Sequence, residues 1–354
     1  MSKTSAVLVC DIRTGSLEIA GLSVLDRLVV TAHRAGCAPI AVECETRLPL
    51  PRAEALGIQI VHTTGRRQEP SEPALKIEGS VLVEVRDLQN VIAQGGALVT
   101  ADGQPLPVRI TLANPKPVVA GAVAMLISDV DSAAEAERRL WASLISSADG
   151  FVDRFFNRPL GRPLSKLLVQ LPVSPNQVSI VSILIGVASA WFFARADFVA
   201  GALIFQLCAI IDCVDGDLAR ALCKQSRLGK WLDLAGDQIV HFSVFAAIGI
   251  GVARTDPSVP ALALGASAAV GVLLCFAVIV RALRQPVAER GQLLNRLLDA
   301  TANRDFSVLL LVLAVCGRME LFLWMAGIGI HIFWMALLAL QARRATSAVP
   351  RTPA

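Results

Sequence analysis

Long apolar segments dominate the chain from Val178 onward, and they constrain its fold more than any other feature. Hydrophobic residues make up 54% of the 354 residues and charged residues only 18%, a composition too apolar for an ordinary soluble protein. Several segments are shorter than the ~20 residues that cross a bilayer unaided, so neighbouring polar turns must contribute. We predict an all-α bundle of six transmembrane helices over residues 178–344, with these spans: Val178–Ala194, Phe198–Asp212, Trp231–Ala253, Pro260–Arg281, Phe306–Gly317 and Leu321–Leu340.

The first 130 residues mix charges with short apolar runs and predict a separate α/β domain. Strand-like runs alternate with helix-like ones, which indicates a mainly parallel sheet covered by helices. Asp102-Gly103 is typical of a tight turn and predicts a hairpin between Ala97–Ala101 and Leu106–Leu112. The other strands expected are Ala6–Ile12, Pro39–Cys44, Gln59–His62 and Ser80–Val85, and the helices are Leu22–Ala35, Pro51–Leu56 and Asp87–Gln94.

Residues 131–177 are predicted to connect the two domains. Ser132–Ser147 is amphipathic, and a juxtamembrane helix follows it. In one interpretation this helix lies at the membrane surface, its aromatic side in lipid and its basic side towards anionic headgroups; in the other it is an ordinary solvated linker. The residues concerned are Phe151, Phe155, Phe156, Arg154, Arg158 and Arg162. Only the tail, residues 345–354, is expected to be disordered.

The distribution of basic residues predicts which side of the membrane the first domain lies on. The amino end has too short an apolar run for a secretory signal, so we expect that domain in the cytoplasm. Basic residues should then lie mostly in cytoplasmic loops. We count twelve there (Arg220, Lys224, Arg227, Lys230, Arg281, Arg284, Arg290, Arg296, Arg304, Arg343, Arg344, Arg351) against three outside (Arg195, Arg254, Arg318). We predict a multi-pass inner-membrane protein with its active site on the cytoplasmic side.

Two further classes are disfavoured by composition. A net charge of +4 is too small to suggest a nucleic-acid partner. The eight cysteines form no C-x-x-C pair and are interpreted as small buried hydrophobic residues rather than disulfides or zinc ligands.

Four aspartates at the inner ends of two apolar spans carry the predicted chemistry: Asp212, Asp215, Asp233 and Asp237. Ionised side chains at such depth are costly and by default functional. Their spacings of three and four residues put each pair on one helix face, so two facing helices would gather four carboxylates. Such a group repels itself unless cations bind, and oxygen ligands suit Mg²⁺ or Mn²⁺. The alternative is a salt-bridge network with Arg220, Lys224, Arg227 and Lys230.

Small residues and an arginine accompany the aspartates. Gly216 lets a bulky ligand approach the backbone, and Gly229 allows close packing at the start of the next helix. Arg220 can donate two hydrogen bonds to phosphate oxygens.

These residues resemble the signature of the CDP-alcohol phosphatidyltransferases, D-x-x-D-G-x-x-A-R-(x)8-G-x-x-x-D-x-x-x-D, at every defined position from Asp212 to Asp237. The resemblance implies two Mg²⁺ or Mn²⁺ ions held by the four aspartates, with Asp237 also acting as general base. It implies that Gly216, Ala219, Arg220 and Gly229 contact the CDP group. The reaction implied is transfer of a substituted phosphate from CDP-diacylglycerol or a CDP-polyol to an alcohol, releasing CMP. A homodimer is expected on the same ground.

A second stretch, Ser174-Pro175-Asn176-Gln-Val-Ser179, is similar to the family's P-N-x-x-T element, which faces the nucleotide. Asn176 and Ser179 are therefore further candidates for binding the CDP group. The alternative is a plain helix start with Ser174 as its cap.

The acceptor site is less sharply indicated. Arg281, Arg304 and Arg343 are placed as in the inositol-phosphate-using branch of the family, which implies a polyol-phosphate acceptor. The positive-inside rule would put arginines there in any case. His241, one turn after Asp237 on its helix, is interpreted as a packing residue rather than part of the acid site.

The first domain resembles a degenerate nucleotidyltransferase. Leu22–Gly36 and the strand after it fit that fold, but VCDIRTGSLEIAG lacks the glycine-rich phosphate loop, and Asp87 stands alone where an active relative would bind metal. We expect a regulatory or architectural domain. The alternatives are a bifunctional enzyme whose first domain makes the CDP-linked donor as a cytidylyltransferase, and a non-enzymatic membrane scaffold or cation carrier.

Overall fold

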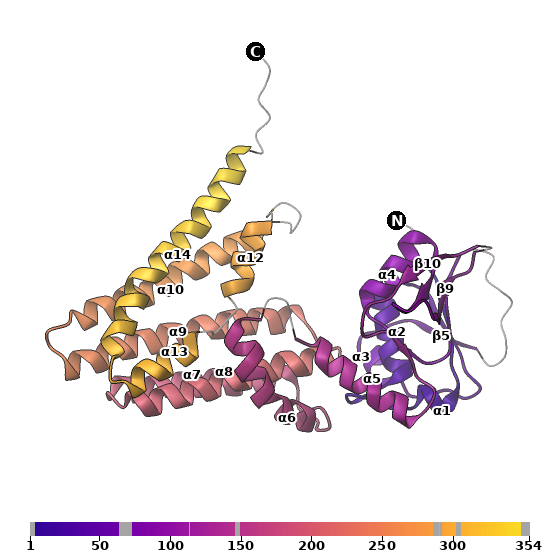
Figure 1. Ribbon diagram of the computed structural model, residues 1–354, viewed down its shortest axis with the longest axis horizontal. Helices are drawn as coiled ribbons and strands as arrows, with labels where there is room; N and C mark the ends of the chain where they lie inside the picture. Colours follow the sequence, from indigo (N-terminus) through magenta and orange to yellow (C-terminus); the bar gives the residue numbers. More distant parts are fainter. Residues whose placement is uncertain are drawn as a thin grey trace, which may run out of the picture. The chain divides into compact units, whose positions relative to one another are not determined.

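The structure, a computed structural model, describes residues 4–63, 73–112, 114–145, 149–285, 290, 292–301 and 306–347 (Figure 1). These residues form two compact units. The first is Met1–Leu144 together with Arg220–Lys224, and the second is Ile145–Ala219 together with Gln225–Ala354. We describe each unit by itself.

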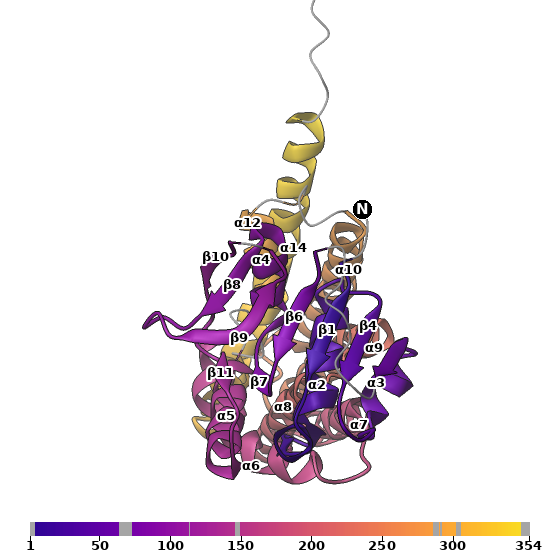
Figure 2. The same cartoon turned by 90° about the vertical axis from the view of Figure 1, so that its right-hand side faces the viewer.

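A seven-stranded mixed sheet forms the centre of the first unit (Figure 2). The strand order is β10 (Lys116–Val119), β8 (Gly96–Val99), β9 (Pro105–Ile110), β6 (Leu75–Glu78), β1 (Ala6–Val9), β4 (Ile40–Glu43) and β5 (Ile60–Thr63). Strands β6, β1, β4 and β5 are parallel, as are β10 and β8. Strand β9 is antiparallel to both of its neighbours. The predicted hairpin is therefore confirmed, with Ala97 opposite Arg109 and Gly103 in the left-handed region (φ 79°) between its strands.

One central strand differs from the prediction. Ser80–Val85 was expected to be a strand of the main sheet, but it contributes only β7 (Val81–Leu82), which pairs with β11 (Met125–Leu126) outside that sheet. Strand β6, five residues earlier, occupies the central position instead. Leu75 and Ile77 on β6 are fully buried, and they alternate with the more exposed Lys76 and Glu78. Alternation is the pattern of a strand, and the denser apolar run after it concealed that signal.

Helices α1 (Ile12–Gly15), α2 (Val24–Arg34), α3 (Pro51–Ala55), α4 (Val85–Gln94) and α5 (Val130–Ser143) complete the first unit, with a two-strand ribbon of β2 (Glu18–Ile19) and β3 (Leu22–Ser23). The predicted helix from Leu22 begins at Val24, because the Ser23 hydroxyl accepts the amide of Asp26 as an N-terminal cap. Within this unit, the Cys223 carbonyl of the turn Arg220–Lys224 accepts hydrogen bonds from Arg34 (2.6 Å) and Arg52 (2.8 Å).

Asp87 is the residue that stands where an active nucleotidyltransferase would bind metal. It lies in the first turn of α4, where its carboxylate accepts the amide of Glu84 at 3.0 Å and that of Gly121 at 2.9 Å. Asp87 is buried, 4% exposed. It therefore stabilises the start of a helix and the loop that carries Gly121.

Among the described residues of the second unit, five helices are long and apolar enough to cross a membrane: α7 (Pro175–Ala194), α8 (Phe198–Ala221), α9 (Arg227–Thr255), α10 (Ala261–Leu283) and α14 (Met319–Ser347). Five of the six predicted spans thus correspond to long helices. The remaining span corresponds to α13 (Phe306–Val315), which is apolar but has only ten residues. Ten residues rise about 15 Å, half the hydrocarbon thickness, so the count of six spans stays a prediction. The short helix α12 (Gln292–Thr301) precedes α13.

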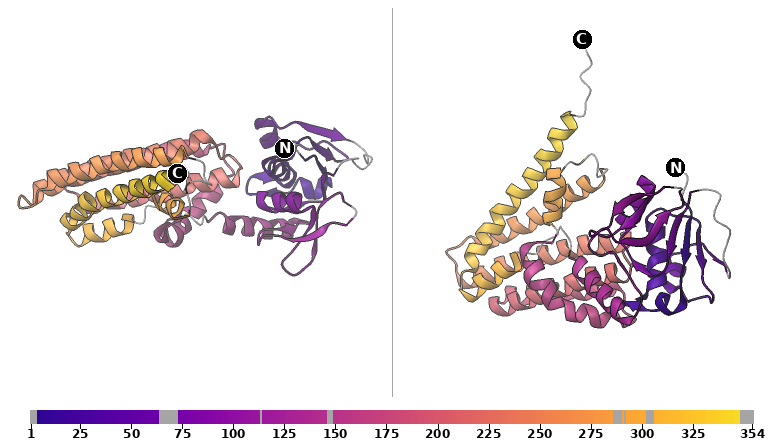
Figure 3. Two further views of the ribbon diagram at one scale, coloured as in Figure 1. Left: turned by 90° about the horizontal axis from the view of Figure 1, so that it is seen from above. Right: turned by 45° about the vertical axis from the view of Figure 1, so that its right-hand side comes forward.

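Small residues bring α7 against α8 and α9. A Cβ added to Gly186 of α7 would lie 2.6 Å from Val240 of α9 and 2.9 Å from Cys208 of α8. Gly236 of α9 is similarly close to Ile183 of α7. These helices run alongside one another in Figure 1 and in the right-hand view of Figure 3. Close approach at small residues is typical of helices packed in membranes.

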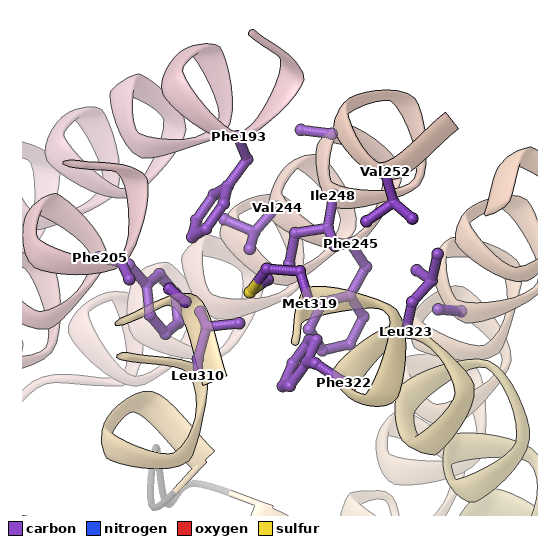
Figure 4. Packing of buried hydrophobic residues seen from close by; sticks show 14 of the residues in the cluster. Phe193, Phe205, Val244, Phe245, Ile248, Val252, Leu310, Met319, Phe322 and Leu323 are labelled. Carbon is purple, nitrogen blue, oxygen red and sulfur yellow. The ribbon is translucent and has the colours of Figure 1, made fainter. Parts of the chain in front are cut away.

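An apolar cluster fills the centre of this unit (Figure 4). Phe193 and Phe205 lie near Val244 of α9, and Phe245 lies beside Phe322 of α14. Because the cluster joins α7, α8, α9, α10, α13 and α14, these helices pack as one body, and the polar ends of α8 and α9 are held in a fixed arrangement.

The juxtamembrane segment consists of a π-helical turn, η1 (Asp153–Asn157), and α6 (Arg158–Leu168). Phe151, Phe155 and Phe156 are exposed, as predicted for a face in lipid. The basic face differs from the prediction, because Arg158 is 6% exposed and pairs with acids inside the protein rather than pointing to headgroups.

Candidate metal and nucleotide site

Three carboxylates converge between α8 and α9. One oxygen each from Asp212, Asp215 and Asp233 lies within 4.8 Å of the other two. Asp212 and Asp215 are three residues apart on α8, so they share a face, and the packing of α7 against both helices places Asp233 opposite them. The sequence predicted that four carboxylates come together, and three of the four do so in the described residues.

The three carboxylates fit a divalent cation. All donors are hard oxygens, which Mg²⁺ and Mn²⁺ prefer. Their burial is graded: Asp215 is 8% exposed, Asp212 is half-buried and Asp233 is exposed. Because Asp215 is buried and Asp233 is exposed, the site is accessible on the Asp233 side. A ligand could approach a bound cation from that side.

Asp237 lies one turn after Asp233 on α9 and is 6% exposed. It is not among the three carboxylates that converge within 4.8 Å in the described residues. Its role as a metal ligand and general base therefore stays a prediction. Its helix places it next to the site but deeper in the bundle.

Two serine hydroxyls on α7 hydrogen-bond to two of the carboxylates. Only one of these serines, Ser179, was predicted to belong to the site. Ser179 donates to Asp215 Oδ2 and Ser182 donates to Asp212 Oδ1 at 3.4 Å. Ser179 was predicted to face the nucleotide, whereas the described contact is to an aspartate. Ser182 was missed, although Ser179, Ser182, Gly186 and Ser189 recur at helical spacing along α7 and are all buried. Such a stripe of small polar residues in an apolar span signals a packed, hydrogen-bonding face.

The remaining nucleotide candidates are placed as follows. Asn176, in the first turn of α7, has its side-chain oxygen 3.1 Å from where a Cβ on Gly229 would stand. The two predicted elements therefore meet at the start of α9, and Gly229 leaves room beside Asn176. Ser174 also caps α7 in a reciprocal box with Gln177, so the helix-start interpretation holds too. Gly216, Ala219 and Arg220 follow Asp215 on α8 and are half-buried.

The acceptor candidates are only partly described. Arg281 lies in the last turn of α10 and is exposed. Arg343 lies on α14, and its side chain is outside what the structure describes, as is Arg304 altogether. The acceptor pocket stays a prediction.

His241 packs among aromatic rings. Its ring stacks on Phe245 (centroids 6.0 Å, interplanar 13°) and meets the edge of Phe306 at 5.2 Å. These contacts agree with the predicted packing role. Beside it, an apolar cavity of ≈ 330 Å³ extends between α9, α10, α13 and α14, and Gln238, the residue after Asp237, is among the residues that line it.

Buried ion pairs lie on the opposite side of α8. Arg158 donates to Asp217 Oδ1 at 2.6 Å and to Asp149 Oδ1 at 2.7 Å. Burial lowers the pKa of the Arg158 guanidinium, but the hydrogen bond to Asp149 and the charge of Asp217 outweigh it, so the pKa lies above its ordinary value.

Residues 172–337 match the family model described as CDP-alcohol phosphatidyltransferase. This part of the chain is a CDP-alcohol phosphatidyltransferase domain. The match contains all four predicted aspartates, the Asn176 element and the five long apolar helices up to residue 337. The chain therefore carries this domain on helices that are long and apolar enough to cross a membrane.

Two similar proteins of known name align with part of this chain. A bifunctional IPC transferase and DIPP synthase of Thermococcus kodakarensis is 36% identical over 125 residues, which are 34% of this chain and 28% of that protein. An archaetidylinositol phosphate synthase of Pyrococcus horikoshii is 33% identical over 86 residues, 24% of this chain and 46% of that protein. The alignments thus span less than half of either relative.

Among solved structures, a phosphatidylinositol phosphate synthase of Mycobacterium tuberculosis with CDP-DAG bound aligns with a TM-score of 0.41 and 20% identity. The alignment covers 55% of this chain and 100% of that chain.

Proposed function

We propose that the protein transfers a substituted phosphate from a CDP-linked donor to the hydroxyl of an alcohol and releases CMP. The convergence of Asp212, Asp215 and Asp233 within 4.8 Å, inside a CDP-alcohol phosphatidyltransferase domain, carries this proposal. Three carboxylates this close repel one another unless cations or protons neutralise them, and the match to this family favours cations.

We assign metal binding to the aspartates and donor binding to the residues around them. Asp212, Asp215 and Asp233 would hold Mg²⁺ or Mn²⁺, and two ions would need Asp237 as a fourth ligand. When bound, such ions neutralise the donor's diphosphate and stabilise the charge on departing CMP. Arg220, two turns after Asp212 on α8, would donate to the diphosphate oxygens. Gly216, Ala219, Asn176 and Gly229 leave room for the cytidine end.

The bond changes balance without a further reactant. The acceptor hydroxyl oxygen attacks the phosphorus that bears the donor alcohol, and the bond from that phosphorus to the CMP oxygen breaks. Asp237 accepts the hydroxyl proton, which requires a carboxylate within hydrogen-bond reach of the acceptor. CMP leaves as the anion.

A lipid-linked donor fits the site better than a soluble one. The cavity of ≈ 330 Å³ that Gln238 helps to line is otherwise lined mainly by apolar side chains such as Phe245, Val272 and Phe306. A hydrocarbon chain is the ligand that an apolar cavity among membrane helices accommodates at least cost. CDP-diacylglycerol is therefore our first choice of donor.

The acceptor we propose is a polyol phosphate. The similar protein of Pyrococcus horikoshii is named as an archaetidylinositol phosphate synthase, and Arg281 ends α10 as an exposed cation. Arg281, Arg304 and Arg343 would bind the acceptor's phosphate. We further propose an inner-membrane location with the acids facing the cytoplasm, as the arginine distribution favours, and a homodimer, as the family resemblance implies.

The test is CMP release from CDP-diacylglycerol by purified full-length protein, with a panel of alcohols that includes inositol and inositol phosphate. We expect release only when an acceptor is present, and fastest with the phosphorylated one. Asp237→Asn should fold but lose transfer, and near wild-type turnover in that variant would refute the base assignment. If Arg281→Ala lowered the affinity for every acceptor equally, whether or not the acceptor is phosphorylated, the proposed phosphate pocket would be refuted.

A further inference from the structure

Asp217 is the third carboxylate in the acid-rich turn of α8, and it occupies a position that the aspartate signature leaves undefined. It follows Asp215 by two residues, yet in the described part of the chain it does not belong to the converging group of three. Its side chain is 1% exposed. A carboxylate so deeply buried needs compensating charge.

Three side chains of α6 supply that compensation. Arg158 Nη1 lies 2.6 Å from Asp217 Oδ1, Arg162 Nε lies 3.3 Å from Oδ2, and the Ser165 hydroxyl donates to Oδ2 at 3.3 Å. Arg158 also pairs with Asp149, just before η1. Two guanidinium groups and a hydroxyl thus occupy both oxygens of Asp217, which explains why it is not available to a metal.

The same helix packs directly on the turn that carries the metal ligands. A Cβ added to Gly161 of α6 would lie 3.0 Å from Val214 Cγ2 and 3.2 Å from the Ile210 carbonyl. Val214 stands between Asp212 and Asp215 in the sequence. Helix α6 therefore touches the backbone of α8 on the side opposite to the metal-binding carboxylates.

Polar contacts continue this interface along both helices. Gln206 of α8 donates to Asn157 Oδ1 at 2.5 Å, and Asn157 in turn donates to Asp153 Oδ1 at 2.7 Å. The contacts extend over three turns of α8, from Gln206 to Asp217. This length indicates a fixed interface rather than a helix that lies loosely at the membrane surface.

We propose that Asp217 is a positioning residue for the metal site: anchored by Arg158 and Arg162, it holds the turn of α8 that aims Asp212 and Asp215 at Asp233. This inference rests on the proposed function, because it presumes that those carboxylates bind a metal. It also assigns the two arginines to the interior of the protein rather than to lipid headgroups.

The experiment measures Mn²⁺ binding directly, by electron paramagnetic resonance of the full-length protein in detergent, and the Mn²⁺ concentration for half-maximal CMP release. The variants are Asp217→Asn, Arg158→Gln and the double variant. The matched control is Asp197→Asn, which removes an exposed acid paired with Arg195 at 3.9 Å.

We expect each single variant to weaken Mn²⁺ binding by about tenfold, the usual effect of losing a partner behind a metal ligand. Release at saturating Mn²⁺ should recover to within about twofold of wild type. The double variant should be no weaker than the worse single one, because the two residues act as a pair. The control should bind Mn²⁺ normally.

Unchanged Mn²⁺ affinity in both folded single variants would overturn the proposal. If either fails to fold, Arg162→Lys keeps the charge but loses the planar fork, and unchanged affinity there would be equally decisive. If the wild type and Asp217→Asn bind Mn²⁺ and release CMP equally well, only this inference is refuted. Wild-type protein that binds no Mn²⁺ would refute the proposed function as well.

Discussion

Ser179 and Asp215 show how a single hydroxyl can set the geometry of an acid site. Ser179 is 6% exposed, donates to Asp215 and is also within 3.2 Å of the Pro175 carbonyl. A buried serine with both contacts holds the carboxylate in one orientation. Ser189, on the same helix, is equally buried but donates only to the Gly186 carbonyl among its described contacts.

Replacing Ser179 with alanine should therefore weaken metal-dependent activity by about 10- to 100-fold, the range found for partners that orient metal ligands. Metal titration of CMP release measures the effect. Ser189→Ala is the matched control and should keep wild-type metal dependence. Parallel behaviour of the two variants would show that Ser179 acts only in helix packing.

Cys10 follows β1, where a nucleotidyltransferase would have its phosphate loop, and burial raises the pKa of its thiol to about 11. At pH 8 only about one molecule in a thousand then carries the reactive thiolate at this position. Labelling of Cys10 by iodoacetamide should be slow and should rise about tenfold per pH unit up to about pH 11. The exposed Cys316 should label first, and mass spectrometry of digested protein would reveal the opposite order if Cys10 were reactive.

At the scale of elements, α7 is the helix on which the site depends most. Gly186 allows α7 to touch both Val240 of α9 and Cys208 of α8, and the hydroxyls of α7 contact the aspartates of α8. A side chain at Gly186 would push these helices apart, and displacements of about 1 Å at a reacting centre can cost 10²-fold in rate.

Gly186→Val should accordingly lower CMP release by about 10²-fold and destabilise the membrane unit by about 1–3 kcal/mol, as overpacking does. Ala188→Val adds a similar bulk to the exposed face of the same helix and should change neither property by much. Thermal denaturation in detergent and the CMP assay together test this, and an active Gly186→Val protein would contradict the packing described for α7.

The elements also show what sequence could and could not predict. Apolar length predicted six spans, five of which are long helices in the part of the chain that the structure describes. The aspartate spacing predicted a group of four carboxylates, of which Asp212, Asp215 and Asp233 converge. Strand β6 was missed because a four-residue alternation, LKIE, is a weaker signal than the apolar run VLV that follows it. The inward turn of Arg158 could not be predicted, since its partners Asp149 and Asp217 lie 9 and 59 residues away and amphipathic spacing alone does not specify partners.

At the scale of the whole molecule, the chain combines a mixed-sheet unit with a membrane transferase unit. The mixed sheet is compatible with a nucleotidyltransferase relative, but the residue expected to bind metal there, Asp87, accepts two backbone amides instead. A carboxylate committed to a capping box contributes to stability rather than to catalysis. This favours an architectural first unit over one that makes the donor.

Full-length protein given CTP and inositol phosphate should therefore form no CDP-inositol, as judged by chromatography. Asp87→Asn should leave CMP release from CDP-diacylglycerol unchanged while lowering stability by about 1 kcal/mol, the usual value of a cap. Formation of CDP-inositol by the wild type, and its loss in Asp87→Asn, would instead establish the bifunctional alternative.

The central claim is that Asp212, Asp215 and Asp233 act together through a divalent cation that binds a CDP ester. The most direct test removes metal from the full-length protein with a chelator and then titrates Mn²⁺ while CMP release from CDP-diacylglycerol is measured with an acceptor present. We predict no release without metal, saturable recovery with it, and no recovery in Asp215→Asn at any Mn²⁺ concentration. Release that is equally fast in metal-free protein, or in Asp215→Asn, would contradict the account.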